Sequence, residues 1–369
     1  MNPTEDGRIV MTLDAGGTNF RFSAMCGGRP ITETLVLPAS RDNLDKCLQT
    51  LIAGFTEIRQ QCPVMPAAIS FAFPGPADYL RGIIGDLENM PGFRGGTALG
   101  PMLEDLFSIP VFINSDGDLF AYGEAIAGLL PEINRLLEAA GNPKRYRNLV
   151  GLTLGTGFGG GIVIDGKLLE GDNSISGEVW LLRHKLRPAM NAEEGASTRG
   201  VRRDYAELAG IPLEQAPEPK AIFEIGLGQK AGNAAAALEA FRRLGEVAGD
   251  ALASAVALID GIAVIGGGIA GAWPLFLPSL VSELNGFYVN PQGRRLRRLA
   301  STAFNLQEPG QMAVFLKGET REIVIPRTGR KIAYDPMRRT GVGLSCLGAS
   351  QAVAIGAYAF ALQKLDSDS

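Results

Sequence analysis

Two segments of this chain share one plan: a short apolar strand, a glycine-rich turn that carries a threonine, and a second strand. The first segment runs from residues 9–13 through the turn DAGGTN to residues 20–24. The second runs from residues 150–154 through GTGFGGG to residues 162–164. Each is typical of a β-hairpin with a glycine tip, and the recurrence indicates an internally duplicated architecture.

A third glycine cluster, Gly266-Gly267-Gly268, follows the apolar strand expected at residues 262–265. Glycine accounts for 48 of the 369 residues, against a usual share of about 7%. The 46% of hydrophobic residues excludes a fibrous or disordered chain, and the length suggests about two domains. Glycine at this density indicates positions where φ is positive or where the backbone approaches another group closely.

Strands alternate with helices along the rest of the chain. We expect strands at residues 67–72 and 111–113, and helices at 41–61, from about Leu119, at 233–259 and at 349–365. This order predicts an α/β fold with parallel strands buried on both faces. The uncharged run 261–282 is long enough to span a bilayer, but its three glycines, Pro274 and Pro278 favour a strand, a turn and a helix.

Residues 287–340 differ from the rest of the chain because they are rich in arginine, including Arg294-Arg295 and Arg297-Arg298, with a β-like run at 322–325. The chain as a whole has 35 basic and 39 acidic residues, a net charge of −4. We therefore expect a solvated insertion there rather than a nucleic-acid-binding patch.

The compartment is indicated by the cysteines and the N-terminal sequence. Cys26, Cys47, Cys62 and Cys346 are far apart and form no CxxC pair, which favours free thiols in a reducing cytoplasm. The acidic start of the chain lacks the apolar stretch of a secretory signal. We expect a cytoplasmic protein that binds neither membranes nor nucleic acid.

The glycine turns are candidate phosphate sites. In DAGGTN, Gly16 and Gly17 would present consecutive backbone N–H groups, with side-chain donors from Thr18 and Asn19. Asp14, at the strand end, could hold Mg²⁺ through water, although an ordinary hairpin turn with Asp14 in an Asx bond is the alternative. The later turns would add a second phosphate contact and a close approach to a nucleotide, at Gly155, Thr156, Gly157, Gly267 and Gly268.

Taken together, DAGGTNFRFS, LGTGFGGG and VIGGGIAGA resemble the phosphate-1, phosphate-2 and adenosine motifs of the actin-like ATPase superfamily, and within it the ROK family of sugar kinases and sugar-responsive repressors. The resemblance covers nearly the whole chain outside 287–340. It implies two duplicated RNase H-like domains with an interdomain cleft. The domains would be 1–118, completed by 347–369, and 119–346, with an insertion near 287–340. It also implies ATP and Mg²⁺ as cofactors and a homodimer.

The same resemblance assigns further roles. NSDGDLFAYGEA (114–125) is similar to the family segment that carries the catalytic base, here Asp116. NMPGF (89–93), Gly177-Glu178-Val179 and the ExxAS element resemble sugar-binding elements, which makes Asn89, Glu178 and Glu193 sugar ligands, together with Asp116. Without the resemblance, these three would be read as solvated loop residues.

A physical argument supports Asp116. A carboxylate that follows a buried strand and precedes a helix lies where open α/β sheets bind ligands. Alternatively, Asp116 or Asp118 caps the helix expected at Leu119. We expect the base at Asp116 and the cap at Asp118.

The chain departs from the family in three places. Leu181 occupies the position of the histidine in the family's GH motif. The family's CxCGxxGC zinc-binding segment is absent, and Asn191 occupies the position of one of its cysteines, so zinc is not expected. The single histidine, His184, is expected to be a structural partner. No helix-turn-helix precedes the first motif, which argues against a repressor.

The sequence therefore predicts an ATP-dependent hexose kinase of the glucokinase type that phosphorylates a sugar hydroxyl, with the 6-OH preferred. Glucose is the default substrate, before mannose, fructose and N-acetylhexosamines. The alternatives are a non-catalytic sensor that binds sugar and nucleotide, and an actin-like or chaperone-like ATPase that acts on proteins.

Overall fold

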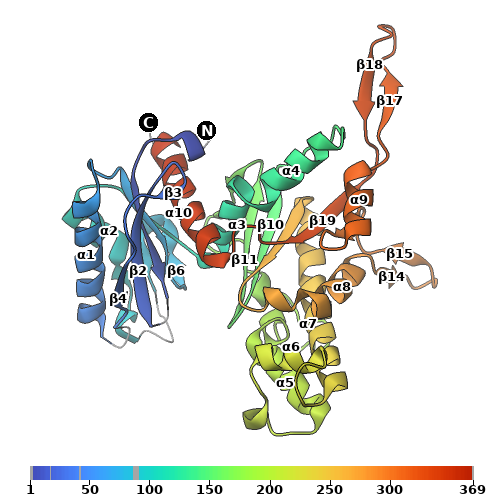
Figure 1. Ribbon diagram of the computed structural model, residues 1–369, viewed down its shortest axis with the longest axis horizontal. Coiled ribbons are helices and arrows are strands. Elements are labelled where there is room, and N and C mark those ends of the chain that lie inside the picture. The colour runs from blue at the N-terminus through green and yellow to red at the C-terminus, as the bar shows by residue number, and fades with distance from the viewer. Residues whose placement is uncertain (1–2, 17, 41–42, 86–90, 368–369) are drawn as a thin grey trace. The chain divides into compact units, whose positions relative to one another are not determined.

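The structure is a computed structural model that describes residues 3–16, 18–40, 43–85 and 91–367. The chain divides into two compact units (Figure 1). The first comprises Met1–Ala127, Lys167–Ser176 and Leu347–Ser369, and the second comprises Gly128–Gly166 and Gly177–Cys346.

The first unit is built on a sheet in the order β3-β2-β1-β5-β9, with β4 paired to β2. β1, β5 and β9 are parallel, and β2 is antiparallel to β1. Its strands are β1 (Val10–Ala15), β2 (Asn19–Cys26), β3 (Arg29–Pro30), β4 (Leu35–Pro38), β5 (Ala68–Ala72), β6 (Ala77–Asp78), β7 (Ile83–Ile84), β8 (Thr97–Ala98), β9 (Val111–Asn114) and β12 (Lys167–Leu168). Its helices are α1 (Leu44–Gln61), α2 (Leu99–Phe107), α3 (Asp116–Ile126) and α10 (Ala349–Ser367).

Helix α1 shows how local sequence determines these elements. Asn43 is its N-cap, and the Asn43 side chain accepts a hydrogen bond from the Lys46 N–H. Leu51, Phe55 and Ile58, spaced three to four residues apart, form its buried face. The expected start at residue 41 cannot be compared, because 41–42 lie outside the described residues.

Helices α3 and α10 pack with their backbones unusually close. A Cβ on Gly123 would lie 1.9 Å from the Ala352 carbonyl oxygen, and a Cβ on Gly356 would lie 1.9 Å from that of Leu119. Only glycine fits at these crossings. Because α3 packs on α10, the first compact unit extends to Ala127, beyond the boundary at 118 that the motifs suggested.

The second unit contains a sheet of the same plan, with strands in the order β11-β10-β13-β19-β16. β11 is antiparallel to β10, and the other neighbours are parallel. Its strands are β10 (Leu149–Leu154), β11 (Phe158–Ile164), β13 (Ile262–Gly266), β14 (Phe287–Val289), β15 (Arg295–Arg297), β16 (Thr302–Asn305), β17 (Arg321–Val324), β18 (Lys331–Tyr334) and β19 (Arg339–Leu344). Its helices are α4 (Leu129–Ala139), α5 (Thr198–Ala209), α6 (Pro219–Gly226), α7 (Ala234–Ile259), α8 (Trp273–Leu284) and α9 (Pro309–Lys317).

The structure corrects the view of 287–340 as one solvated insertion. β16 is a strand of the main sheet, with Ala303 and Phe304 buried, and α9 buries Phe315 against the same unit. Only two hairpins, β14–β15 and β17–β18, project from the unit (Figure 1). The arginine-rich composition of residues 287–340 as a whole does not indicate the short buried strand that lies within them.

The run 261–282 forms strand β13, a glycine turn and helix α8, as predicted. Among the described residues, no helix has both the length and the apolar character needed to span a bilayer.

Candidate functional site

In the first unit, two aspartates lie at one edge of the sheet. β1, β5 and β9 are parallel, so their carboxyl ends share that edge. Asp14 is the second-last residue of β1, and Asp116 follows β9 by two residues. With β5 between them, β1 and β9 are about 10 Å apart. The structure therefore brings together the two aspartates that the sequence assigned to metal and base.

The first glycine turn connects β1 and β2. The Gly16 N–H donates to the Asp14 carbonyl (3.0 Å), and a Cβ on Gly16 would lie 2.8 Å from the Asn19 carbonyl oxygen. The turn is therefore too tight for a side chain at Gly16. Thr18 and Asn19 are exposed, so their side chains are accessible to a ligand. Gly17 lies outside the described residues.

Asp116 is the first residue of α3, three residues before the expected start. The N-cap is Ser115, whose hydroxyl accepts the Asp118 N–H (3.0 Å), so the prediction that Asp118 caps the helix was wrong. The Asp116 side chain is solvent-accessible. Desolvation by the surrounding protein nevertheless raises the pKa of its carboxyl group, and hydrogen bonds from backbone N–H groups, including that of Gly117 (2.8 Å), partly offset this. A carboxylate with a raised pKa is the stronger base.

In the second unit, the structure places two glycine turns side by side. The Ile269 N–H donates to the Leu154 carbonyl (2.9 Å), which joins the turn after β13 to the end of β10. Gly267 has a φ of +91°, and a Cβ there would lie 2.4 Å from the Leu154 carbonyl oxygen. In contrast, a Cβ on Gly268 would meet nothing within 4 Å, and one on Gly155 would meet only the Gly268 nitrogen, at 3.9 Å.

Glu193 lies on the turn formed by Gly155, Thr156 and Gly157. Its Oε2 accepts the backbone N–H of Phe158 (3.1 Å), and its Oε1 accepts from Arg199 Nη2 (2.9 Å). Therefore, the glutamate that the resemblance assigned to sugar is hydrogen-bonded to the backbone of a candidate phosphate turn.

Two residues of this turn's surroundings were not anticipated from the sequence. The backbone N–H and the hydroxyl of Thr198 both donate to the Gly155 carbonyl (2.9 and 2.7 Å). Arg199 orients Glu193 and also bonds Glu194 (3.1 Å). The sequence signal that could have indicated them is Ser197, a residue type that often caps helices. It is the N-cap of α5, and Thr198 and Arg199 are the first two residues of that helix.

Glu178 also lies beside β11. It precedes a short 3₁₀ turn, Val179–Leu181, and its carboxylate accepts from the Trp180 indole N–H. The preceding Gly177 has a φ of +74° and packs against Gly160 and Gly161. Glu193 thus bonds to the first residue of β11, and the glycine before Glu178 packs against the third and fourth residues of the same strand. Asn89, the third expected sugar ligand, lies outside the described residues.

His184 organises the loop that would carry zinc in the family pattern. It is fully buried, and its Nδ1 accepts the N–H groups of Leu186 and Arg187 (both 3.1 Å). Asn191 caps the 3₁₀ turn Ala192–Glu194. Within the described ranges, no group of three or more His, Cys, Asp or Glu side chains is arranged to hold a metal.

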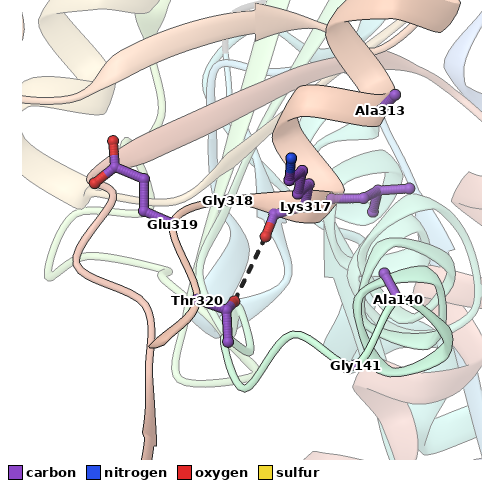
Figure 2. Close-up of a pocket in the computed structure, with 8 residues that line it drawn as sticks. Ala140, Gly141, Ala313, Lys317, Gly318, Glu319 and Thr320 are labelled. Atoms are coloured by element: carbon purple, nitrogen blue, oxygen red, sulfur yellow. Dashed lines mark hydrogen bonds between the residues drawn. The ribbon is translucent and has the colours of Figure 1, made fainter. Parts of the chain in front are cut away.

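The second unit also has a hollow of about 590 Å³ at the C-terminal ends of α4 and α9 (Figure 2). It is lined by Ala140, Gly141, Ala313, Leu316, Lys317, Gly318, Glu319 and Thr320. None of the predicted site residues lines it, so it is separate from the glycine turns.

Comparisons with known proteins agree with the motifs. The ROK family model matches residues 10–305. A glucokinase structure from Parabacteroides distasonis ATCC 8503 is 56% identical to this chain, with a TM-score of 0.89 over 98% of this chain and 99% of that one. The N-acetyl-D-glucosamine kinase of Vibrio cholerae serotype O1 is 28% identical over 271 residues, 70% of this chain and 83% of the relative. A ROK family glucokinase from Streptomyces griseus, in complex with glucose and AMPPNP, is 19% identical and shares the fold, with a TM-score of 0.59 over 96% of this chain and 99% of that one.

Proposed function

Because the chain belongs to the ROK family and has its mixed α/β fold, we propose that it is an ATP-dependent hexose kinase of the glucokinase type. The observation that carries the proposal is the position of Asp116, an accessible carboxylate of raised pKa at the end of β9, on the same sheet edge as Asp14. The 56% identity to a glucokinase supports glucose as the substrate.

Asp116 is the proposed general base. Its carboxylate takes the proton of the sugar hydroxyl, here the 6-OH, as the hydroxyl oxygen attacks the γ-phosphorus of ATP in line. One oxygen–phosphorus bond forms, the bond to the β–γ bridging oxygen breaks, and ADP leaves. Phosphoryl transfer depends mainly on positioning and charge neutralisation. A positioned base contributes a factor of about 10²–10⁴.

The glycine turns would hold the phosphates. The backbone N–H groups of Gly17 and Gly157 would contact the phosphates, and the threonine of each turn would add a hydroxyl. Those of Gly16 and Gly155 bond within the turns, to the carbonyls of Asp14 and Gly157, and so hold the turns in shape. Gly267 and Gly268 would receive the nucleotide, since the open space at Gly268 leaves room for a close approach.

Asp14 fits Mg²⁺, because its half-buried carboxylate at the strand end is a hard oxygen donor beside the first turn. When bound, Mg²⁺ neutralises negative charge on the phosphates.

The sugar would be held by Asn89, Glu178 and Glu193 in addition to Asp116. Glu178 and Glu193 both lie along β11. The common plan of the two sheets, an antiparallel hairpin followed by parallel strands, supports the inference that the two units are duplicated.

The test is Asp116→Asn in a coupled assay of ADP release with glucose, mannose, fructose and N-acetylglucosamine. We expect kcat to fall at least about 100-fold while glucose still binds by calorimetry. Asp105→Asn, on the exposed face of α2, is the matched control and should retain wild-type turnover. If Asp116→Asn keeps most of its turnover, the assignment of the base is wrong.

The wild-type protein distinguishes the two alternatives. Sugar binding without ADP release across the panel would favour a non-catalytic sensor. ATP hydrolysis at a rate indifferent to sugar would favour an ATPase that acts on another class of substrate.

A further inference from the structure

The two candidate sugar carboxylates of the second unit, Glu178 and Glu193, lie on one paired stretch of backbone. The Ala192 N–H donates to the Leu182 carbonyl (2.7 Å), which ties the segment after Glu178 to the segment before Glu193. Glu178 lies four residues before Leu182, and Glu193 directly follows Ala192. The position of one carboxylate is therefore linked through the backbone to the position of the other.

The backbone on both sides of Glu178 packs directly on β11. A Cβ on Gly160 would lie 2.5 Å from the Gly177 carbonyl oxygen and 2.6 Å from Val179 Cγ2, and Val179 is buried. The Glu178 carbonyl also accepts the Leu181 N–H (3.2 Å). With its backbone fixed in this way, Glu178 can move its carboxylate only by rotation about its own side-chain torsions.

Trp180 restrains that remaining freedom. Its indole N–H donates to Glu178 Oε2. The ring is partly buried and packs on the hydrophobic core of the second unit. Tryptophan has only two side-chain torsions, so a packed ring presents its N–H at one place. The other side chains of the same 3₁₀ turn, those of Val179 and Leu181, are apolar and cannot donate a hydrogen bond.

A carboxylate held in this way is suited to binding a neutral hydroxyl. A flexible glutamate loses rotamer freedom when it binds a ligand, and a glutamate that is already held loses less. The indole carries no charge, so it leaves the negative charge of the carboxylate in place, and a charged acceptor makes the stronger hydrogen bond to a hydroxyl. Glu193 differs in this respect, because Arg199 places a positive charge 2.9 Å from its Oε1.

We propose that Trp180 is a positioning residue for the sugar: its indole N–H holds the Glu178 carboxylate in the orientation that accepts a sugar hydroxyl. The inference rests on the proposed role of Glu178 as a sugar ligand. Trp180 acts through Glu178 and takes no part in proton or phosphoryl transfer. It therefore controls the affinity for the sugar, and the KM that follows from it, rather than kcat.

The test is Trp180→Phe, which keeps an aromatic ring in the core and removes the N–H. Trp273→Phe is the matched control, because Trp273 is the only other tryptophan of the chain and also packs, partly buried, on the same core. Calorimetric titration with glucose in the absence of nucleotide gives Kd, and coupled ADP release gives KM and kcat. We expect Trp180→Phe to raise Kd and KM for glucose about 10-fold, to change kcat less than about twofold, and the control to match the wild type.

Two further measurements show whether Trp180 acts through Glu178. The double variant Trp180→Phe with Glu178→Gln should bind glucose no more weakly than Glu178→Gln alone. In Trp273→Phe, Trp180 is the one remaining tryptophan, so the fluorescence of that variant reports on its indole directly. The emission should shift as glucose binds, and this readout does not depend on the stability of Trp180→Phe.

A wild-type Kd for Trp180→Phe beside a raised Kd for Glu178→Gln would overturn the inference, because the tryptophan would then only fill the core. Emission that glucose leaves unchanged, in a Trp273→Phe protein that binds glucose by calorimetry, would also overturn it. Wild-type binding by Glu178→Gln would do the same, since Glu178 would be no sugar ligand. A wild type that binds glucose but releases no ADP would instead overturn the proposed kinase, and a raised Kd for Trp180→Phe would still support the inference.

Discussion

The carboxylate of Glu193 occupies the space beside the Gly157 backbone: a Cβ on Gly157 would lie 2.8 Å from Glu193 Oε2. The same oxygen accepts the N–H of Phe158, so the position of Glu193 depends on a glycine in the turn. A candidate sugar ligand and a candidate phosphate turn are thereby linked in one contact.

Gly157→Ala should displace Glu193 without unfolding the unit, because the atom in the way is the end of a flexible side chain. We expect an almost unchanged Tm and a fall in kcat/KM for glucose on the order of 100-fold, as for other displacements of about 1 Å in active sites. Gly310→Ala, where a Cβ meets nothing within 4 Å, is the control. If Gly157→Ala and Glu193→Gln act through the same contact, the double variant should be no worse than the poorer single one.

Gly267 and Gly268 should respond to alanine in opposite ways. Gly267→Ala introduces a side chain at a positive φ and against the Leu154 backbone, so we expect a loss of stability of about 1–3 kcal/mol. Gly268→Ala meets nothing in the protein, so its Tm should stay at the wild-type value. If the open space at Gly268 receives the nucleotide, the KM for ATP should rise about 10-fold. A wild-type KM for Gly268→Ala would contradict that role, and thermal melts with ATP titrations separate the two effects.

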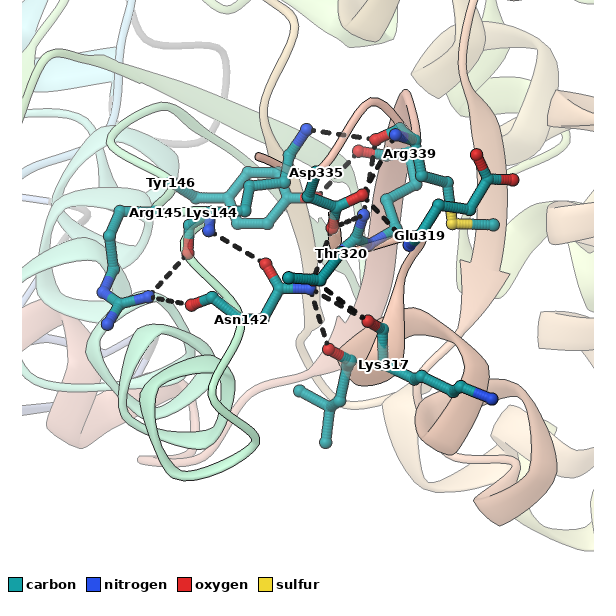
Figure 3. A network of polar contacts seen from close by, with 11 residues as sticks. Asn142, Lys144, Arg145, Tyr146, Lys317, Glu319, Thr320, Asp335 and Arg339 are labelled. Atoms are coloured by element: carbon teal, nitrogen blue, oxygen red, sulfur yellow. Dashed lines mark hydrogen bonds and ion pairs between the residues drawn. The ribbon is translucent and has the colours of Figure 1, made fainter. Parts of the chain in front are cut away.

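The Asp335–Arg339 pair should make stability depend on acid pH. Burial alone would raise the pKa of Asp335, but hydrogen bonds from Asn142, the Glu319 N–H and Arg339 outweigh it and lower the pKa to about 2 (Figure 3). Because the pKa is lower in the folded protein, the charged carboxylate stabilises the fold at any pH above the pKa of an aspartate in the unfolded chain, about 3.9. This contribution is lost as the pH falls towards 2.

Asp335→Asn should therefore lower the free energy of unfolding by about 3–5 kcal/mol at neutral pH, because it leaves the buried Arg339 without its counterion. Chemical denaturation at pH 7 and at acid pH measures both effects. Glu322→Gln, which breaks an exposed ion pair with Lys331 on the hairpin β17–β18, is the control and should change the Tm little. Equal losses of stability in the two variants would show that the buried pair contributes no more than the exposed one.

His184 should give a second, separate pH dependence. Burial lowers the pKa of its imidazole, and the charges of Arg187 and Arg203 act in the same direction against that of Asp204. Since Nδ1 accepts two N–H groups, the neutral ring stabilises the loop above the unfolded pKa of about 6.5, and this contribution is lost as the pH falls through the lower folded value.

In His184→Asn, the amide oxygen can accept an N–H but does not titrate. The variant should be less stable than the wild type at pH 8 by about 1 kcal/mol. The difference should shrink on acidification below pH 6.5. A difference that is constant with pH would contradict the role of the neutral imidazole.

Local sequence signals predicted much of the fold. The two glycine-tipped hairpins, the strand–turn–helix at 261–282 and helix α7 are all present. Helix α7 begins within one residue of its expected start because Asn233 is a strong cap, with its side chain accepting the Ala236 N–H. These elements depend on residues close together in the chain.

Contacts between distant segments could not be predicted in the same way. The bond from Phe158 to Glu193 joins residues 35 positions apart, and no pattern in either segment indicates it. At α3, Ser115, Asp116 and Asp118 are all residue types that cap helices, so composition alone could not identify Ser115 as the cap. The roles of Gly17 and Asn89 remain predictions.

The packing of α10 on α3 and on the sheet of the first unit has a consequence for synthesis of the chain. Val10, Met25 and Ala68 of that sheet are buried with Ile355, Tyr358 and Leu362 of α10. As the chain emerges from the ribosome, the first unit cannot close until residues 349–367 have been made, whereas the second unit lacks no part of its sheet by then. The first unit therefore begins to be translated first but is completed last. The apolar face of its sheet stays exposed until α10 has been synthesised, near the end of elongation.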